Sequence, residues 1–152
     1  NYLIINYMTK VSSSTTISKP IKEIFEYMAS PYNGPAFIPN LNENTNIFPE
    51  KNGVGQRFDW RFNMAGVDLR GKAEVVEHTP PTKVIISSKG DADSTWTYTL
   101  EEADGGTKVS VEIDYELAET ALQRIVNKTV ISKLAQKTTD QMLENLKIIL
   151  ET

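Results

Sequence analysis

The stretch RFDWRFNM, residues 57–64, alternates polar side chains with large apolar ones along its whole length. Successive side chains of a β-strand point to opposite faces of the sheet, so Phe58, Trp60 and Phe62 share one face. The other face carries the charged residues Arg57, Asp59 and Arg61. One-sided alternation of this kind is typical of an antiparallel strand that is buried on one face and solvated on the other.

The same alternation continues on both sides of this stretch. Residues 67–75, 83–88, 95–100 and 109–117 are predicted strands on its C-terminal side, and residues 9–17 and 44–48 on its N-terminal side. Short turns such as Ala65-Gly66 and Asp104-Gly105-Gly106 join neighbours, which makes the pairing antiparallel. The predicted sheet therefore has six or seven strands. Its buried face also carries Leu69, Val75, Trp96, Tyr98, Val111, Ile113 and Tyr115.

Two short helical segments are expected between the first two strands. Pro20 suits the first turn of a helix, and Ile24, Phe25 and Met28 recur at helical spacing before Pro31 ends it. The segment from Pro31 to Pro39 holds three prolines and a glycine, so it is a short helix or a structured loop with Phe37 at its apolar tip.

A long C-terminal helix is predicted over residues 119–150, which contain neither Gly nor Pro. The apolar stripe before residue 127 is out of phase with the later one, which indicates a break near residues 127–129. The later inner stripe consists of Ile131, Leu134, Ala135, Thr138, Met142, Leu146 and Ile149. Thr138 is its polar member, and it either bonds back to a helix carbonyl or faces a ligand.

One helix is too narrow to cover such a sheet. A helix is about 10 Å wide, whereas six or seven strands at ~4.8 Å each span roughly 30 Å. Either the sheet curls around the helix and leaves an apolar cavity, or the aromatic side chains fill the space as a solid core. The alternation alone leaves both alternatives open.

Several short motifs add a family resemblance. They are Ile17-Ser18-Lys19-Pro20-Ile21, Phe37-Ile38-Pro39-Asn40-Leu41, Gly53-Val54-Gly55, Glu77-His78-Thr79-Pro80-Pro81, Trp96-Thr97-Tyr98-Thr99-Leu100 and Gly106-Thr107-Lys108-Val109. In this order, over residues 9–150, the chain resembles the START/polyketide-cyclase superfamily, whose helix-grip fold is that of the birch-pollen allergen. The resemblance implies an α+β fold with a curved antiparallel sheet wrapped around the long C-terminal helix, and a cavity for lipids, polyketides or other apolar molecules.

The expected function is therefore binding or transport of a small hydrophobic ligand, lipid- or polyketide-like, without a catalytic residue. We expect the ligand to contact the inner faces of the sheet and helix, at Phe37, Phe58, Trp60, Phe62, Leu69, Val75, Trp96, Tyr98, Val111, Ile113, Tyr115, Ile131, Leu134, Thr138 and Met142. One alternative is a polyketide cyclase or aromatase, which needs a proton donor or acceptor in the pocket. Another is an interaction protein resembling the accessory subunits of carbon-monoxide dehydrogenase, which exposed aromatics around Phe37 would favour.

Composition narrows the remaining function classes. The 152 residues suit one domain, expected over residues 9–152 with an extension over residues 1–8. There is no cysteine and only one histidine, so no metal or other cofactor is expected. The net charge of −4 and the scattered basic residues argue against nucleic acid. No apolar run reaches the ~18 residues of a membrane span, and we expect a cytoplasmic protein, with a homodimer as one option.

Three polar residues attract attention but have ordinary explanations. His78 is the only histidine of the chain, yet it is expected to be solvated at a strand end beside Pro80 and Pro81. Asp91 and Asp93 beside Gly90 are expected in a turn, because two carboxylates without further ligands make a poor calcium site.

Overall fold

The computed structural model describes residues 8–126 and 128–152, and its architecture is α+β. Its seven strands form one sheet in the order β1-β7-β6-β5-β4-β3-β2, and every neighbouring pair is antiparallel. The strands are β1 (Met8–Ile17), β2 (Leu41–Phe48), β3 (Arg57–Met64), β4 (Val67–Thr79), β5 (Lys83–Gly90), β6 (Ala92–Ala103) and β7 (Gly106–Leu117). β1 begins one residue before the expected boundary at Thr9, and residues 1–7 lie outside the described residues.

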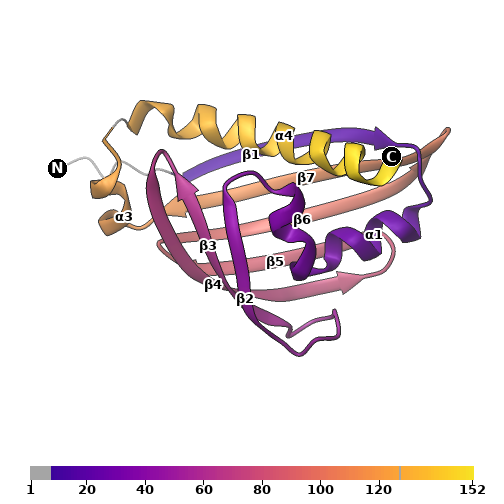
Figure 1. Cartoon of the computed structure of the whole chain (residues 1–152), viewed down its shortest axis with the longest axis horizontal. Helices are drawn as coiled ribbons and strands as arrows, with labels where there is room; N and C mark the ends of the chain where they lie inside the picture. Colours follow the sequence, from indigo (N-terminus) through magenta and orange to yellow (C-terminus); the bar gives the residue numbers. More distant parts are fainter. Residues whose placement is uncertain (1–7, 127) are drawn as a thin grey trace.

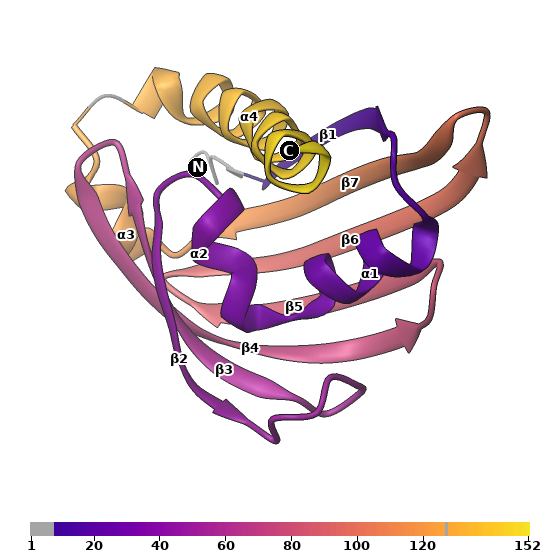
Figure 2. The same ribbon diagram turned by 45° about the vertical axis from the view of Figure 1, so that its right-hand side comes forward.

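The helices lie on the concave face of this sheet. Figures 1 and 2 show the sheet curving around the long C-terminal helix, which runs beside β1. The first helix packs over β6, and the second contacts both β2 and the long helix. The helices are α1 (Ile21–Ala29), α2 (Gly34–Phe37), α3 (Glu119–Arg124) and α4 (Ile131–Glu151), with 3₁₀ turns at Pro31–Asn33 and Lys128–Val130. The expected helix-grip arrangement is therefore confirmed.

The predicted strand at residues 57–64 pairs with β4 through a tight hairpin. Trp60 lies opposite Gly71 and Phe62 opposite Leu69, and Ala65 and Gly66 both have positive φ in the connecting turn. Two adjacent residues with positive φ give the twist that a two-residue hairpin requires. The hairpin therefore holds the aromatic side chains of β3 in register over the concave face.

The outer face of β3 is charged, as its alternation predicts. The Asp59 carboxylate accepts hydrogen bonds from Asn46 Nδ2 and Lys72 Nζ at 2.8 and 2.9 Å, and both bonds lower its pKa. Arg61 donates to the carboxylate of Asp68 at 3.1 Å across the β3–β4 hairpin. These pairs face solvent, so they contribute little to stability individually and keep this side of the sheet hydrated.

The predicted long helix is broken where its apolar stripes change phase. α3 ends at Arg124, a 3₁₀ turn covers Lys128–Val130, and α4 begins at Ile131, while Asn127 lies outside the described residues. In the segment that connects the two helices, Ile125 is fully buried and Val126 is 98% exposed. The break therefore lies where the phase of the apolar pattern changes. Among the described residues, no helix is both long and apolar enough to cross a membrane.

The inner stripe of α4 differs from the predicted one near its C-terminus. Ile149 is 37% exposed, whereas Leu143 and Thr139, which the stripe left out, are 1% exposed. α4 packs along β1 at the edge of the sheet and also contacts α2, so its buried face is wider than one stripe and is turned toward Leu143. The prediction of Ile149 as an inward residue was therefore wrong.

Leu146 tests how much α4 contributes to stability. Leu146 is fully buried, so Leu146→Ala should lower the free energy of unfolding by about 2–5 kcal/mol in urea denaturation. Ile148, 59% exposed on the same helix, is the matched control, and Ile148→Ala should change that free energy by less than about 0.5 kcal/mol. Equal losses in the two variants would contradict the observed packing of α4.

Candidate ligand-binding cavity

A cavity of about 340 Å³ lies between the concave face of the sheet and the helices α1, α2 and α4. Its wall is mainly apolar and aromatic, and it receives side chains from every strand of the sheet. The helices leave this space unfilled because α4 packs along β1 and does not reach the centre of the sheet. The open alternative of a solid core therefore does not apply to this part of the interior.

Most of the predicted binding residues reach this cavity. Twelve of them line it: Phe37, Phe58, Trp60, Phe62, Leu69, Val75, Trp96, Tyr98, Ile113, Tyr115, Leu134 and Thr138. The strand residues reach the cavity because alternate positions of each strand point to its inner face, and Leu134 and Thr138 come from the first half of α4. That these side chains contact a ligand stays a prediction.

Three predicted residues lie elsewhere, in the packed core. Val111, Ile131 and Met142 are at most 2% exposed and are absent from the cavity wall. Met142 lies in the half of α4 that α2 covers, where Asn145 Nδ2 donates to the Phe37 carbonyl at 3.1 Å. Met142 therefore does not line the cavity as predicted, because the sequence pattern does not show where α2 docks.

Some wall residues were missed although their parity was readable. Ser88 and Ile86 share a face of β5 with the buried Val84, and Ser94 shares a face of β6 with Trp96. The two serines were not predicted as wall residues, because only apolar residues were used to trace the inner face of each strand. The predicted ligand contacts also left out the end of α1, the turns that follow it and β2, which supply Met28, Ala29, Pro31, Asn40, Leu41 and Asn44.

Trp60 lies flat against β4 because residue 71 is glycine. A Cβ atom at Gly71 would collide with the Trp60 indole and with the Lys89 carbonyl oxygen. Any side chain there would push the indole ring off the strand and into the cavity. The Trp60 Nε1 atom is buried and has no hydrogen-bond partner, which is an unfavourable consequence of this close packing.

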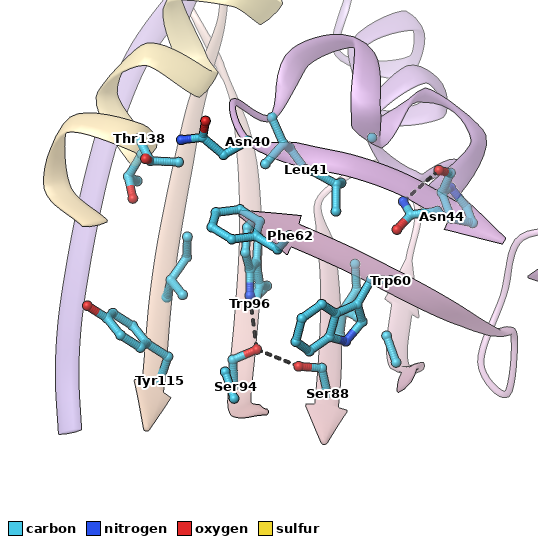
Figure 3. A pocket seen from close by; sticks show the side chains of 18 of the residues that line it. Asn40, Leu41, Asn44, Trp60, Phe62, Ser88, Ser94, Trp96, Tyr115 and Thr138 are labelled. Atoms are coloured by element: carbon cyan, nitrogen blue, oxygen red, sulfur yellow. Dashed lines mark hydrogen bonds between the residues drawn. The ribbon is translucent and has the colours of Figure 1, made fainter. Parts of the chain in front are cut away.

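One end of the cavity carries a small hydrogen-bonded group. Figure 3 shows the Trp96 indole above Ser94, with Ser88 beside it. Trp96 Nε1 donates to Ser94 Oγ at 3.1 Å, and Ser94 Oγ lies 2.7 Å from Ser88 Oγ. Ser88 and Ser94 are paired residues in the β5–β6 ladder, which places their side chains next to each other.

The opposite end of the cavity is formed by amide and hydroxyl side chains. Figure 3 shows Asn40 and Thr138 facing each other there, one from the turn before β2 and the other from α4. Asn44 Nδ2 donates to the Pro31 carbonyl at 2.8 Å and ties β2 to the helical segment, while its Oδ1 atom is buried without a partner. Thr139, and not Thr138, makes the bond back to a helix carbonyl, at 2.7 Å from Ala135 O. The Thr138 side chain instead lines the cavity, where its hydroxyl can contact an occupant.

The cavity wall is electrically neutral. No Asp, Glu, Lys, Arg or His is among the described residues that line it. Tyr98 and Tyr115 are the ionisable members, and burial raises the pKa of both hydroxyls. Both tyrosines therefore stay protonated at neutral pH, and neither acts as an anion or a general base there.

The polar residues that attracted attention in the sequence lie outside the wall. His78 is half-buried, with its ring centroid 5.3 Å from that of Phe25. Asp91 Oδ2 accepts from the backbone N–H of Arg70 at 2.9 Å and pairs with Arg124, while Asp93 Oδ1 accepts from the backbone N–H of Gly90. The two aspartates thus organise the β5–β6 turn. The described residues hold no group of three or more acidic or histidine side chains placed to bind a metal ion.

The comparisons with known proteins fit this geometry. The sequence profile of the family described as polyketide cyclase / dehydrase and lipid transport matches residues 8–151. The chain belongs to this family. The match begins where β1 begins and ends at the last residue of α4, so it covers the whole sheet and every helix of the structure. Among curated protein sequences, none matches the chain.

Solved structures show the same fold at low sequence identity. TTHA0849 from Thermus thermophilus is 17% identical with a TM-score of 0.76, over 92% of this chain and 95% of that one. Ara h 8.0201 is 15% identical with a TM-score of 0.64, over 95% and 99%. StfQ, a di-domain ARO/CYC protein of the steffimycin biosynthetic pathway, is 13% identical with a TM-score of 0.73. The match to StfQ covers 95% of the chain described here but only 51% of StfQ.

The buried Tyr98 hydroxyl gives the stability a defined dependence on alkaline pH. An unfolded tyrosine loses its proton near pH 10, whereas burial raises the pKa of Tyr98 well above that value. The unfolded state is therefore the first to ionise, so stability that is present below about pH 10 is lost as the pH rises above it. Urea denaturation at increasing pH should show this loss in the wild type and a smaller loss in Tyr98→Phe.

The control for this effect is a tyrosine whose ring is outside the core. Tyr32 is 57% exposed, so Tyr32→Phe should lose stability with pH as the wild type does. If Tyr98→Phe and the wild type lose stability in parallel above about pH 10, the Tyr98 hydroxyl is not buried in solution.

Proposed function

We propose that this protein binds and carries a small, uncharged and largely apolar molecule in the cavity between the sheet and α4. The observation that carries the proposal is a cavity of about 340 Å³ whose aromatic wall holds no charged side chain. This volume lies at the lower end of the range for small-molecule sites, which are typically apolar with a few placed polar groups. The family description, which includes lipid transport, supports the same conclusion.

Neutrality of the wall restricts the class of ligand. A carboxylate, phosphate or ammonium group inside the cavity would lose its hydration without gaining a partner of opposite charge. Aromatic rings such as Trp60, Trp96 and Phe62 instead offer large flat surfaces for contact with an apolar skeleton. A molecule with an ionised group would have to keep that group outside the cavity.

A cyclase or dehydratase is the second candidate, because the family description also names these activities and StfQ is an ARO/CYC protein. Such a reaction needs a group that accepts a proton in the cavity. The two tyrosines there are held in the protonated form, so they supply hydrogen-bond donors but no base. This makes binding without chemistry the better-supported function. Phe37 itself does not support the accessory-protein alternative, because it is only 1% exposed, although Tyr32 in the preceding turn is 57% exposed.

Co-purification tests the proposal directly. Native mass spectrometry of the purified protein should show an added mass that disappears after extraction with organic solvent, and the extract should hold a neutral organic molecule. Protein stripped in this way should bind a neutral naphthalene dye with increased fluorescence. A stripped protein that binds no neutral apolar probe would refute the proposal, and turnover of a polyketide-like substrate would favour the enzyme.

A variant that fills part of the cavity should weaken this binding. Leu134 lines the wall, so Leu134→Trp should weaken dye binding by roughly tenfold, which corresponds to about 1.4 kcal/mol. Lys137 is exposed on the outer side of the same helix, so Lys137→Trp is the matched control and should bind the dye as the wild type does. Equal binding by all three proteins, measured by fluorescence titration, would place the dye outside the cavity.

A further inference from the structure

Ser88 and Ser94 form a polar spot on a wall that is otherwise mainly aromatic and aliphatic. Ser88 is 7% exposed, and its Oγ atom lies 2.7 Å from Ser94 Oγ. Ser94 Oγ also accepts the indole N–H of Trp96 at 3.1 Å. Both serines line the cavity, and Figure 3 shows them at the opposite end from Asn40 and Thr138.

Counting hydrogens shows that this group has one donor too many. The Trp96 N–H and the two serine O–H groups supply three hydrogens, and the two contacts within the group use two of them. If Ser94 donates to Ser88, the Ser88 hydrogen remains, and if Ser88 donates to Ser94, the Ser94 hydrogen remains. No other hydrogen bond of either side chain exists among the described residues. One hydroxyl hydrogen is therefore left without an acceptor, whichever way the two hydroxyls rotate.

A hydroxyl hydrogen on an apolar cavity wall is unfavourable without an acceptor, so the protein gains when an occupant accepts this hydrogen. The acceptor is a neutral oxygen, because the wall offers no cation to accompany an anion. We propose that the ligand carries an uncharged acceptor oxygen, such as a ketone or ester carbonyl, which accepts a hydrogen bond from the Ser88–Ser94 pair. This inference rests on the proposed function. The pair thus fixes the orientation of an otherwise apolar molecule.

Two probes that differ only in this oxygen test the assignment. One is a dimethylaminonaphthalene that carries a propionyl ketone, and the other is its parent compound with a propyl group at the same position, in which CH2 replaces the carbonyl. Fluorescence titration of the stripped protein gives a Kd for each. The wild type should bind the ketone about three- to tenfold more tightly than the parent, as one hydrogen bond between neutral groups provides.

The variant Ser88→Ala/Ser94→Ala removes both hydroxyls and should strongly reduce this preference, because the one donor that remains, the Trp96 N–H, is aimed at the former position of Ser94 Oγ. Its affinity for the parent naphthalene should match that of the wild type, which shows that the cavity is intact. Ser87 lies next to Ser88 on the same strand but outside the cavity wall, so Ser87→Ala is the matched control and should keep the preference. The carbonyl stretching frequency of the bound ketone should be lower in the wild type than in the double variant.

The outcomes separate this inference from the function on which it rests. If the wild type binds both probes equally, a water molecule satisfies the serines and the inference is overturned while cavity binding stands. The inference is also overturned if the double variant keeps the full preference for the ketone. If the stripped wild type binds neither probe, the proposed function fails first. A preference that is strongly reduced in Ser88→Ala/Ser94→Ala and kept in Ser87→Ala supports the assignment.

Discussion

The concave face of the sheet is wider than the single helix that packs on it. Seven strands at ~4.8 Å each span roughly 30 Å, and α4 with its side chains covers about 10 Å of that width. The chain meets this mismatch in two ways. The sheet curls toward α4 along β1, and α1 and α2 cover a further part of the concave face. The space that remains between them is the cavity, so the cavity is a consequence of the same geometry that forms the core.

The strand pattern predicted the wall of the cavity well because a strand has a fixed period of two. Parity alone placed Trp60, Trp96 and Tyr98 on one face, and register then brings them together. The helix was predicted less well, since several faces of a helix can be buried when it touches more than one element. Met142 and Ile149 were misplaced for this reason: α2 covers the first, and α4 is turned at the edge of the sheet. The polar wall residues Ser88 and Ser94 were missed because only apolar residues were followed along the strands.

The chemistry of the wall is more specific than the fold. The description of the family names polyketide cyclase, dehydrase and lipid transport, and the similar solved structures share the fold at 13–17% identity. In this chain the charged residues of β3 and β4 lie on the outer face, in pairs such as Asp59 with Lys72. The described residues that line the cavity include no charged side chain and no histidine, which is the observation behind our proposal of an uncharged ligand.

The two tryptophans of the chain, Trp60 and Trp96, both line the cavity, so their indole N–H signals report directly on its occupancy. The most direct test is a titration of the stripped, ¹⁵N-labelled protein with a neutral naphthalene, followed by ¹H–¹⁵N correlation NMR. Binding inside the cavity should make both indole signals shift and saturate together, while backbone signals on the outer face around Asp59 and Lys72 stay in place. Shifts confined to the outer face, or saturating binding that leaves both indole signals unmoved, would contradict binding inside the cavity.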